Sequence, residues 1–331
     1  MKPRTSAAAL DEEIRAAESS AYRHYGLEPT EQIVSVASPF GLLGVRLSIF
    51  GPDDAPAPPV LVMHGIASVS VLAAPVIAAL PDRRVIAIDW PGHGLSGPSI
   101  LPPRSRIRAY VVAVLRALLD ELQLSEVDVV GHSMGAQFGL YASLELPDRV
   151  RRLVLLGAPG AAFRGVRPTA IMIVLAVPGI GPRLLALPMS PETFVRNNEK
   201  PLGAGALRDT PPELTGAAYL IGRRATYPAS VASYFRAMLR GAVVRREVTI
   251  SPDELATLRQ PTLLVWGDED VFMRPLDGAR HIAAIRDSHL VRLPEAGHAP
   301  WLQYPERVGH VVAEHLGAAS IDQNPQGGQP R

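Results

Sequence analysis

The residues best suited to chemistry form the pentapeptide Gly131-His132-Ser133-Met134-Gly135, which follows an apolar run at 127–130. A serine hydroxyl is a weak nucleophile until a neighbouring base takes its proton. A sharp turn from a strand into a helix exposes such a serine, and it requires small residues two positions before and two positions after it. We therefore predict that Ser133 is a nucleophile at the start of a helix, where the helix dipole favours developing negative charge. A plain glycine-rich turn is the alternative.

A serine nucleophile needs a base and a carboxylate that orients this base. His298 lies in the loop after the last apolar run of strand type, before a final helix. Three carboxylates follow the preceding buried-type run, at positions 268–270. We predict that His298 is the base and Asp270 the orienting acid, because Asp268 directly follows the glycine that ends the strand and suits hydrogen bonds within the turn. Asp268 stays the alternative.

Acyl transfer also requires two N–H donors that stabilise an oxyanion. The backbone N–H of Met134, next to the nucleophile, is one candidate. The second is expected in the loop after the apolar run 60–63, where Gly65 permits a close approach and Ile66 offers its N–H group. We predict that His64 anchors this loop.

The elements that must position these residues alternate between buried strands and helices. Short apolar runs predict strands at 60–63, 85–88, 127–130, 153–156 and 262–266, with a weaker one at 290–293. Apolar residues at helical spacing predict a helix over 107–122. The segments 32–37 and 45–50 predict two further strands as an antiparallel start. The pattern indicates an α/β fold with a mostly parallel central sheet and helices on both faces.

The alternation fails after about residue 157, where prolines and short helical pieces replace the strands. We predict that residues 158–250 form an inserted, mainly helical cap, that 1–157 and 251–318 form the core, and that 319–331 are a disordered tail. The stretch 170–189 is mostly apolar, but its prolines and glycines interrupt it well short of the ~20 residues that a membrane span needs. We expect this stretch to be buried or to face the substrate.

The composition excludes several classes of function. The chain has 331 residues, a net charge of +1 and no cysteine. The sequence has no basic stripe of the kind that would indicate a nucleic-acid partner. The absence of cysteine excludes disulfides, thiolate metal sites and a cysteine nucleophile. No secretory signal is apparent at the N-terminus. We expect a cytoplasmic protein that acts on a small molecule without a metal or an organic cofactor. The pattern favours no particular oligomeric state.

With serine, acid and histidine in this chain order, the sequence resembles the α/β-hydrolase superfamily. His64-Gly65 is similar to that family's oxyanion motif, and Gly267 with Asp270 to its strand-end G-x-x-D. The segment 89–96 resembles its D-x-x-G-x-G-x-S loop, which is structural there, and 297–300 its terminal G-H segment. The resemblance implies an α/β-hydrolase fold. Haloalkane dehalogenases and epoxide hydrolases of this fold carry an aspartate at the turn where this chain has Ser133, and this difference argues against both activities.

The expected function is hydrolysis of an ester-type bond in a small, hydrophobic substrate, through a Ser133-His298-Asp270 triad and an acyl-enzyme intermediate. A carbon–carbon bond hydrolase or an acyltransferase on the same triad is one alternative. A ligand-binding protein with little turnover is another.

Overall fold

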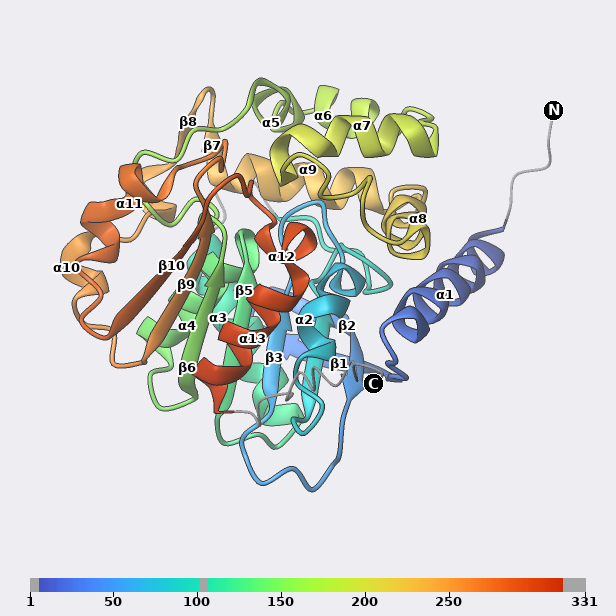
Figure 1. Ribbon diagram of the computed structural model, residues 1–331. Coiled ribbons are helices and arrows are strands. Elements are labelled where there is room, and N and C mark those ends of the chain that lie inside the picture. Colours follow the sequence, from blue (N-terminus) through green and yellow to red (C-terminus); the bar gives the residue numbers. More distant parts are fainter. Residues whose placement is uncertain (1–5, 102–105, 318–331) are drawn as a thin grey trace, which may run out of the picture.

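An eight-stranded sheet runs through the centre of the protein (Figure 1). The computed structural model describes residues 6–101 and 106–317. In spatial order the strands are β1 (Thr30–Ser38), β2 (Gly41–Phe50), β4 (Val85–Asp89), β3 (Val60–Met63), β5 (Val127–His132), β6 (Val150–Leu156), β9 (Thr262–Gly267) and β10 (Ser288–Leu293). The pairs β1–β2 and β2–β4 are antiparallel and the other five are parallel. The predicted mostly parallel sheet with an antiparallel start is confirmed.

The central strands are buried along their whole length, as their uniformly apolar sequences predict. The register aligns their carboxyl ends, because Met63 of β3 lies beside Gly131 of β5 and Leu156 of β6 lies beside Val265 of β9. Loops that follow these strands therefore leave the sheet at one edge. This is the edge at which open α/β sheets bind ligands.

Helices cover both faces of the sheet. On one face, α3 (Ile107–Glu121) and α4 (Met134–Glu145) pack with the strands into one apolar core. On the other face, a second core joins α1 (Ala7–His24), α2 (Ala74–Ala78), α12 (Pro300–Gln303) and α13 (Pro305–Leu316). Two further helices, α10 (Pro252–Leu255) and α11 (Pro275–Ile282), flank β9 in the chain. This arrangement confirms the predicted helices on both faces.

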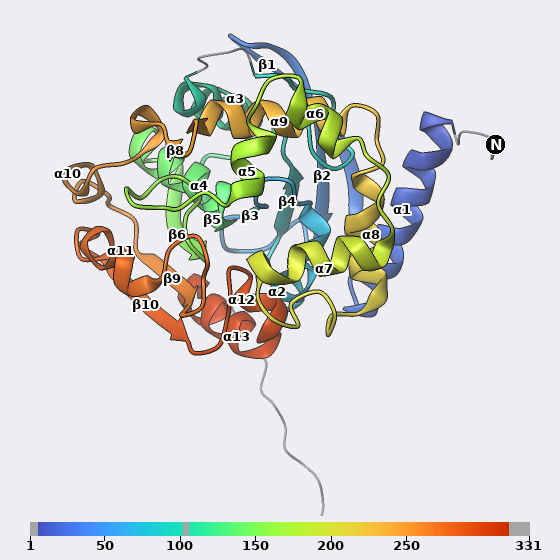
Figure 2. The same ribbon diagram turned by 90° about the horizontal axis from the view of Figure 1, so that it is seen from above.

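A helical insertion lies between β6 and β9 in the chain and above the carboxyl edge of the sheet (Figures 1 and 2). Its helices are α5 (Ala170–Leu175), α6 (Ile180–Leu185), α7 (Pro191–Leu202), α8 (Pro212–Ile221) and α9 (Tyr227–Met238). A two-stranded hairpin follows, formed by β7 (Leu239–Arg240) and β8 (Val243–Val244). We call this insertion the cap. The domain bounds that the sequence predicts stay a prediction, and the predicted tail at 319–331 lies outside the described residues.

The apolar stretch 170–189 differs from its sequence-based expectation. Only Leu175 and Gly181 in it are buried, and six of its large apolar side chains are exposed. The expectation of a buried or substrate-facing segment was therefore wrong for this outer surface. Short helices separated by Pro178-Gly179 present one side to the molecule and the other to solvent.

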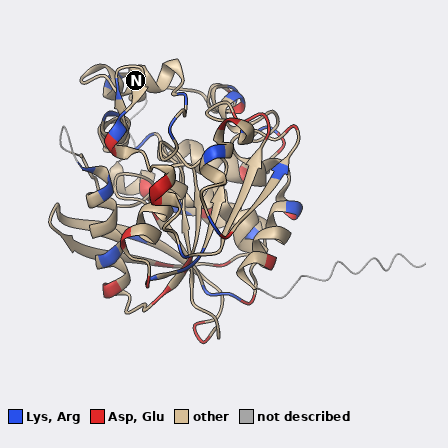
Figure 3. Ribbon diagram, turned by 90° about the vertical axis from the view of Figure 1, so that its left-hand side faces the viewer, with Lys and Arg blue, Asp and Glu red and all other residues tan. Residues whose placement is uncertain are grey.

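Charges of both signs are mixed over the ribbon in the view of Figure 3. In the part of the chain that the structure describes, no helix combines the length and the apolar character that crossing a membrane requires. The mixed charges agree with the small net charge of the sequence.

Candidate active site

Ser133 occupies a strained turn between β5 and α4. Its backbone angles are φ 51° and ψ −111°, a region that residues with a Cβ atom rarely adopt. Gly135 lies so close to β3 that a Cβ there would meet the Met63 carbonyl oxygen at 2.1 Å. The tight packing of this turn explains the glycine that the sequence places two residues after the serine. The strained angles and the close packing agree with the sharp strand-to-helix turn that the sequence predicts.

Asp270 and His298 are hydrogen-bonded to each other. The Nδ1 atom of His298 lies 2.7 Å from Oδ2 of Asp270, and both residues are buried. The same carboxylate accepts the N–H groups of Ala158 at 2.9 Å and Phe272 at 3.0 Å. Because a carboxylate accepts, Nδ1 carries the proton, and Nε2 is left as the basic nitrogen.

Asp268, the alternative acid, faces elsewhere. Its two carboxylate oxygens accept from Nε and Nη2 of Arg292, at 2.8 and 3.0 Å. This pair lies at the surface, and its oxygens make no contact with His298 among the described hydrogen bonds. The geometry therefore favours Asp270 as the partner of His298.

Ser133 and His298 both lie against the end of β6. The N–H of Ser133 donates to the Leu156 carbonyl at 3.3 Å. A Cβ on the next residue, Gly157, would meet the His298 backbone oxygen at 2.4 Å and its Nδ1 at 3.1 Å. The Oγ atom of Ser133 makes no hydrogen bond within the described residues, which leaves it free to meet a base or a substrate. In free enzymes the bond between nucleophile and base is often long and tightens when the substrate binds.

His132 packs next to these groups. Its ring lies 4.7 Å from that of His298 and 4.5 Å from that of Trp301, centroid to centroid. Its Nε2 contacts the His298 carbonyl at 3.2 Å. Burial holds the pKa of His132 well below its usual value, so it is neutral at pH 7 and acts as packing.

The loop after β3 carries the predicted second oxyanion donor. A Cβ on Gly65 would come within 2.8 Å of the His132 ring and 3.3 Å of the Ser133 Cβ, so this loop passes directly over the nucleophile. Within the described chain, the N–H groups of Ile66 and Met134 donate to no protein acceptor. Two free N–H groups on the two segments that flank Ser133 are what an oxyanion hole requires.

Two residues that sequence reasoning did not assign hold this loop at Ala67, which has a positive φ of 55°. His93 accepts the Ala67 N–H at Nε2, at 3.3 Å. The hydroxyl of Tyr227, the first residue of cap helix α9, donates to the Ala67 carbonyl at 3.1 Å. His93 lies in the motif at 89–96, which could have indicated it. Tyr227 has no motif around it, so no sequence signal pointed to its role.

His64 anchors the loop at its other end, as predicted. Its Nδ1 lies 2.7 Å from the Gly65 carbonyl and must donate to it, so Nε2 accepts the Trp90 N–H at 2.9 Å. Both contacts need the neutral ring. Burial lowers the pKa of His64 and of His93, which keeps both rings neutral at pH 7.

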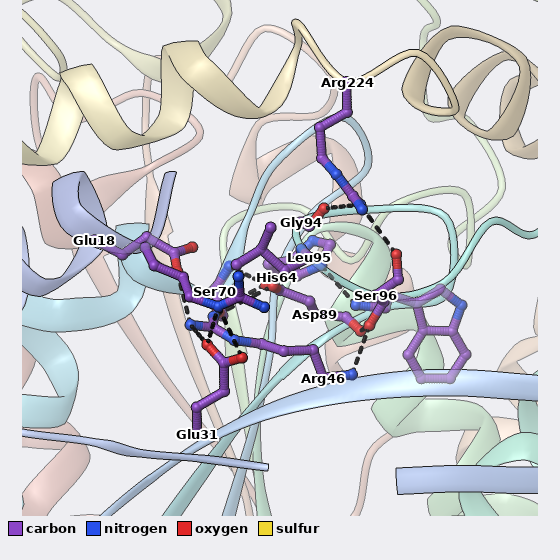
Figure 4. A network of polar contacts seen from close by, with 12 residues as sticks. Glu18, Glu31, Arg46, His64, Ser70, Asp89, Gly94, Leu95, Ser96 and Arg224 are labelled. Carbon is purple, nitrogen blue, oxygen red and sulfur yellow. Dashed lines mark hydrogen bonds and ion pairs between the residues drawn. The ribbon is translucent and has the colours of Figure 1, made fainter. Parts of the chain in front are cut away.

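Figure 4 shows the polar network that fixes the loop at 89–96. Asp89 accepts the N–H and Oγ–H of Ser70 at 3.2 and 2.7 Å and the N–H of Leu95 at 2.9 Å. Arg46 pairs with Asp89 at 3.3 Å and with buried Glu18 of α1 at 2.7 Å. Burial raises the pKa of Glu18 to about 8. The carboxylate of Asp89 thus accepts two backbone N–H groups, a hydroxyl and a guanidinium, which gives this motif a structural role.

Arg224 ties the cap to the core in the same network (Figure 4). From the loop between α8 and α9, its Nη1 donates to the carbonyl oxygens of Gly94 at 2.7 Å and Ser96 at 3.1 Å. Its Nε donates to Asp11 of α1 at 2.9 Å. One side chain thus links α1, the cap and the loop after β4.

The site has apolar surroundings on the side of Ile66 and a charged cavity beside Asp270. Ile66 packs against a cluster built from cap residues: Met172, Leu175, Ala176, Leu184, Leu185, Tyr227, Val231 and Phe235. A cavity of about 230 Å³ borders Asp270 and is lined by residues 269–274 with Gly165, Arg167 and Asp277. Among the described residues, no three histidine, aspartate or glutamate side chains gather as metal ligands would.

Comparisons with known proteins agree with this geometry. A family model described as "alpha/beta hydrolase fold" matches residues 58–186. The 2-hydroxy-6-oxononadienedioate/2-hydroxy-6-oxononatrienedioate hydrolase 2 of Pseudomonas putida is 30% identical over 248 residues, which cover 73% of this chain and 79% of that protein. Haloalkane dehalogenase 2 of Mycobacterium tuberculosis (strain ATCC 25618 / H37Rv) is 27% identical over 287 residues, with 80% and 90% covered.

Among solved structures, carboxylesterase CesB (YbfK) of Bacillus subtilis superposes with a TM-score of 0.72 at 20% identity. The superposition covers 94% of this chain and 99% of that one. A likeness at this level of identity concerns the fold, and it extends over the cap as well as the sheet. Together with the relative that is 30% identical over most of its length, these findings place the chain in the α/β-hydrolase fold family.

Proposed function

We propose that the protein is a serine hydrolase that cleaves an ester-type bond in a small, hydrophobic substrate. In this proposal Ser133 attacks the carbonyl carbon, and Nε2 of His298 takes the Oγ proton and passes it to the leaving alcohol. Asp270 keeps His298 in the required tautomer and stabilises the imidazolium. Water, deprotonated by His298, then attacks the acyl-enzyme and releases the acid. The 2.7 Å contact between Asp270 and His298, beside a strained Ser133, is the observation that carries the proposal.

The N–H groups of Ile66 and Met134 are proposed to hold the oxyanion in both tetrahedral intermediates. Each such donor lowers the activation barrier by on the order of 3 kcal/mol in enzymes of this mechanism. Both groups lack protein acceptors in the described chain, and the loop that carries Ile66 is held by His64, His93 and Tyr227. A fixed donor gives more stabilisation than a mobile one, because no reorganisation is needed during the reaction.

The relatives have diverse activities, so the choice among them rests on the site itself. Dehalogenases of this fold use an aspartate at the turn where this chain has Ser133, and this argues against halide displacement. The Pseudomonas putida relative is named for a dioate substrate, which carries two carboxylates. The cluster against Ile66 is built from apolar side chains and the Tyr227 ring. These surroundings favour an uncharged acyl or alcohol group.

Carbon–carbon bond hydrolysis is the second candidate, on the strength of that relative. It would use the same residues on a vinylogous diketone in place of an ester. Arg167 lines the cavity that borders Asp270, and Arg164, three residues earlier, is exposed. If this candidate is correct, their replacement by glutamine raises KM for a dioate and leaves KM for a neutral ester unchanged.

The test is covalent labelling of the intact chain with a fluorophosphonate, followed by mass spectrometry. We expect one adduct, on Ser133, and none on the Ser133→Ala variant. Labelling should fall about 10³-fold or more in rate in the His298→Ala variant, because the hydroxyl then has no base. An unlabelled wild-type chain would leave only the binding-protein alternative.

Turnover is tested with chromogenic esters of increasing acyl length, with and without added alcohol. We expect the highest kcat/KM for uncharged, hydrophobic acyl groups and release of free acid as the main product. Preferential transfer to the alcohol would identify an acyltransferase instead. A labelled enzyme that cleaves no ester but cleaves a dioate diketone would establish the second candidate.

A further inference from the structure

The loop after β6, residues 157–161, consists of glycine, alanine and proline, so none of its side chains can take part in the reaction. It nevertheless lies against all three proposed catalytic residues. The N–H of Ala158 donates to Oδ2 of Asp270 at 2.9 Å. A Cβ atom on the first glycine of the loop would meet the His298 backbone oxygen, and one on the second would come within 3.1 Å of the Ser133 carbonyl oxygen. We call this segment the β6 loop.

One oxygen of Asp270 contacts both the β6 loop and the base. Oδ2 accepts the Ala158 N–H and lies 2.7 Å from Nδ1 of His298. The other oxygen, Oδ1, accepts the N–H of Phe272 at 3.0 Å. The last torsion of an aspartate side chain has no sharp preference of its own, so hydrogen-bond donors must set the plane of the carboxylate. The β6 loop therefore helps to aim Oδ2 at the imidazole.

The side chain of Gln137, on α4 one turn after the nucleophile, holds the other end of the β6 loop. Its Oε1 accepts the Ala161 N–H at 2.9 Å, and the side chain is fully buried. The turn between the two alanines of the loop is stiff. Pro159 fixes one of its backbone angles, and the Gly160 N–H donates to the Ala158 carbonyl at 2.7 Å. A displacement at Ala161 is therefore passed on to the Ala158 N–H.

The nitrogen of the same amide is held by the end of the cap. Nε2 of Gln137 donates to the Tyr141 hydroxyl at 2.7 Å and to the Val248 carbonyl at 3.2 Å. The Tyr141 hydroxyl donates to this carbonyl too. Because a carbonyl only accepts and a backbone N–H only donates, these partners determine which end of the amide faces the β6 loop. The amide thus joins the start and the end of the cap insertion to the helix of the nucleophile.

We infer that Gln137 is a positioning residue for Asp270, which it holds through the β6 loop. The inference rests on the proposed function, because Asp270 affects turnover as the partner of His298. Within the described chain, the Gln137 side chain makes no hydrogen bond to either residue, so it acts through the backbone between them. A side chain that only filled the core would affect stability alone, whereas a positioning residue also affects the hydrogen bond between Asp270 and His298.

The test is Gln137→Met, which keeps the length of the side chain and leaves the Ala161 N–H without its acceptor. We expect kcat on the best chromogenic ester to fall about tenfold, the effect of a small misplacement of the reacting groups. Proton NMR reports on the Nδ1–H of His298, whose resonance is assigned by its absence in the His298→Ala variant. It should move upfield in Gln137→Met, because a less firmly held carboxylate forms a weaker hydrogen bond.

The matched control is Tyr141→Phe, which removes a buried hydrogen bond from the same cluster and leaves the contact between Gln137 and Ala161 intact. It should lower the thermal unfolding temperature. Its Nδ1–H resonance should stay in place and its kcat within about twofold of the wild type, since misplaced groups are what lower the rate. A second variant, Gly160→Ala, puts a Cβ 2.7 Å from Oε1 of Gln137 and should act in the same direction as Gln137→Met.

An unchanged kcat and an unchanged Nδ1–H resonance in a folded Gln137→Met variant would overturn the inference. Equal changes in Gln137→Met and Tyr141→Phe would also overturn it, because the effect would then belong to the cluster as a whole. The NMR measurement needs no substrate. If the wild type cleaved no ester, the proposed function would fail, and the resonance would still decide whether Gln137 positions Asp270.

Discussion

The carboxyl edge of the sheet and the outer cap are held in different ways. At the edge, Asp270 and His298 are buried, and the carboxylate accepts two backbone N–H groups besides the imidazole. In the cap stretch 170–189, the one described side-chain hydrogen bond within the stretch is that from Arg183 to the Gly179 carbonyl. Apolar packing holds the other residues of this stretch in place. Individual hydrogen bonds therefore fix the positions of the side chains at the edge. In the cap, the apolar side of each short helix fixes how that helix packs. Reaction chemistry belongs to the first region, and contact with the substrate and its surroundings to the second.

The largest effect on activity is expected from a substitution of the orienting carboxylate at the sheet edge. Asp270→Asn should lower kcat about 10⁴-fold, because an amide in this place favours the wrong tautomer of His298. Asp268→Asn, two residues away and paired with Arg292, should stay within about twofold, since surface ion pairs contribute little. Steady-state kinetics on the best chromogenic ester measures both. A larger loss in the Asp268 variant would reverse the assignment of the acid.

The close approach of the oxyanion loop to the nucleophile gives the next largest effect. Gly65→Ala places a methyl group 2.8 Å from the His132 ring and 3.3 Å from the Ser133 Cβ, so the loop must shift. We expect about a 10²-fold loss in kcat, the cost of misplacing one oxyanion donor. The control is Gly216→Ala in α8, where the new methyl group meets nothing within 4 Å. Full activity in the Gly65 variant would argue against a donor on this loop.

The same contrast explains how much the sequence could predict. The strands were predictable because burial on both faces leaves a continuous apolar run. Ser133, Asp270 and His298 could be proposed as site residues because each follows such a run within a few residues. These signals are local. The pairing of Asp270 with His298 was expected from their order in the chain. The distance of 2.7 Å between His298 Nδ1 and Asp270 Oδ2 agrees with this expectation.

The features that sequence reasoning missed depend on contacts between distant segments. Tyr227 and Ala67 are separated by 160 positions, and nothing in either segment indicates the other. The exposure of Ile171 and Val174 could not be predicted either, because an apolar run has the same sequence whether it faces the core or the solvent. Glu18 likewise looks like a solvated helix residue until Arg46 is found beside it.

The buried histidines at the edge make stability depend on pH near ~6, whereas the cap sequence from Ala170 to Val244 contains no histidine. Burial places the pKa of His93 in the folded state well below that in the unfolded state, which is ~6.5. The unfolded chain therefore binds the proton first, and the stability that the neutral ring contributes is present above pH ~6.5 and lost as the pH falls below it. One such group costs up to about 1.4 kcal/mol per pH unit.

His93→Gln keeps an acceptor for the Ala67 N–H and removes this titration. We expect the variant to lose less free energy of unfolding than the wild type between pH 6.5 and 5, by about 1 kcal/mol. Urea unfolding at several pH values measures this difference. His24→Gln, at an exposed position on α1, is the control and should follow the wild type. Parallel curves for all three proteins would mean that His93 does not titrate in this range.

The smallest effect is expected where the two regions touch. Tyr227 donates from the first residue of α9 to the Ala67 carbonyl, next to the candidate donor Ile66. Tyr227→Phe removes one hydrogen bond of about 1 kcal/mol, so kcat should fall about fivefold while KM changes little. Tyr219→Phe is the matched control, because its hydroxyl also donates to a backbone carbonyl, that of Met189, but within the cap. A loss in kcat confined to Tyr227 would mean that the cap helps to hold the oxyanion loop. Equal behaviour of the two variants would mean that the edge positions its own chemistry and the cap only covers it.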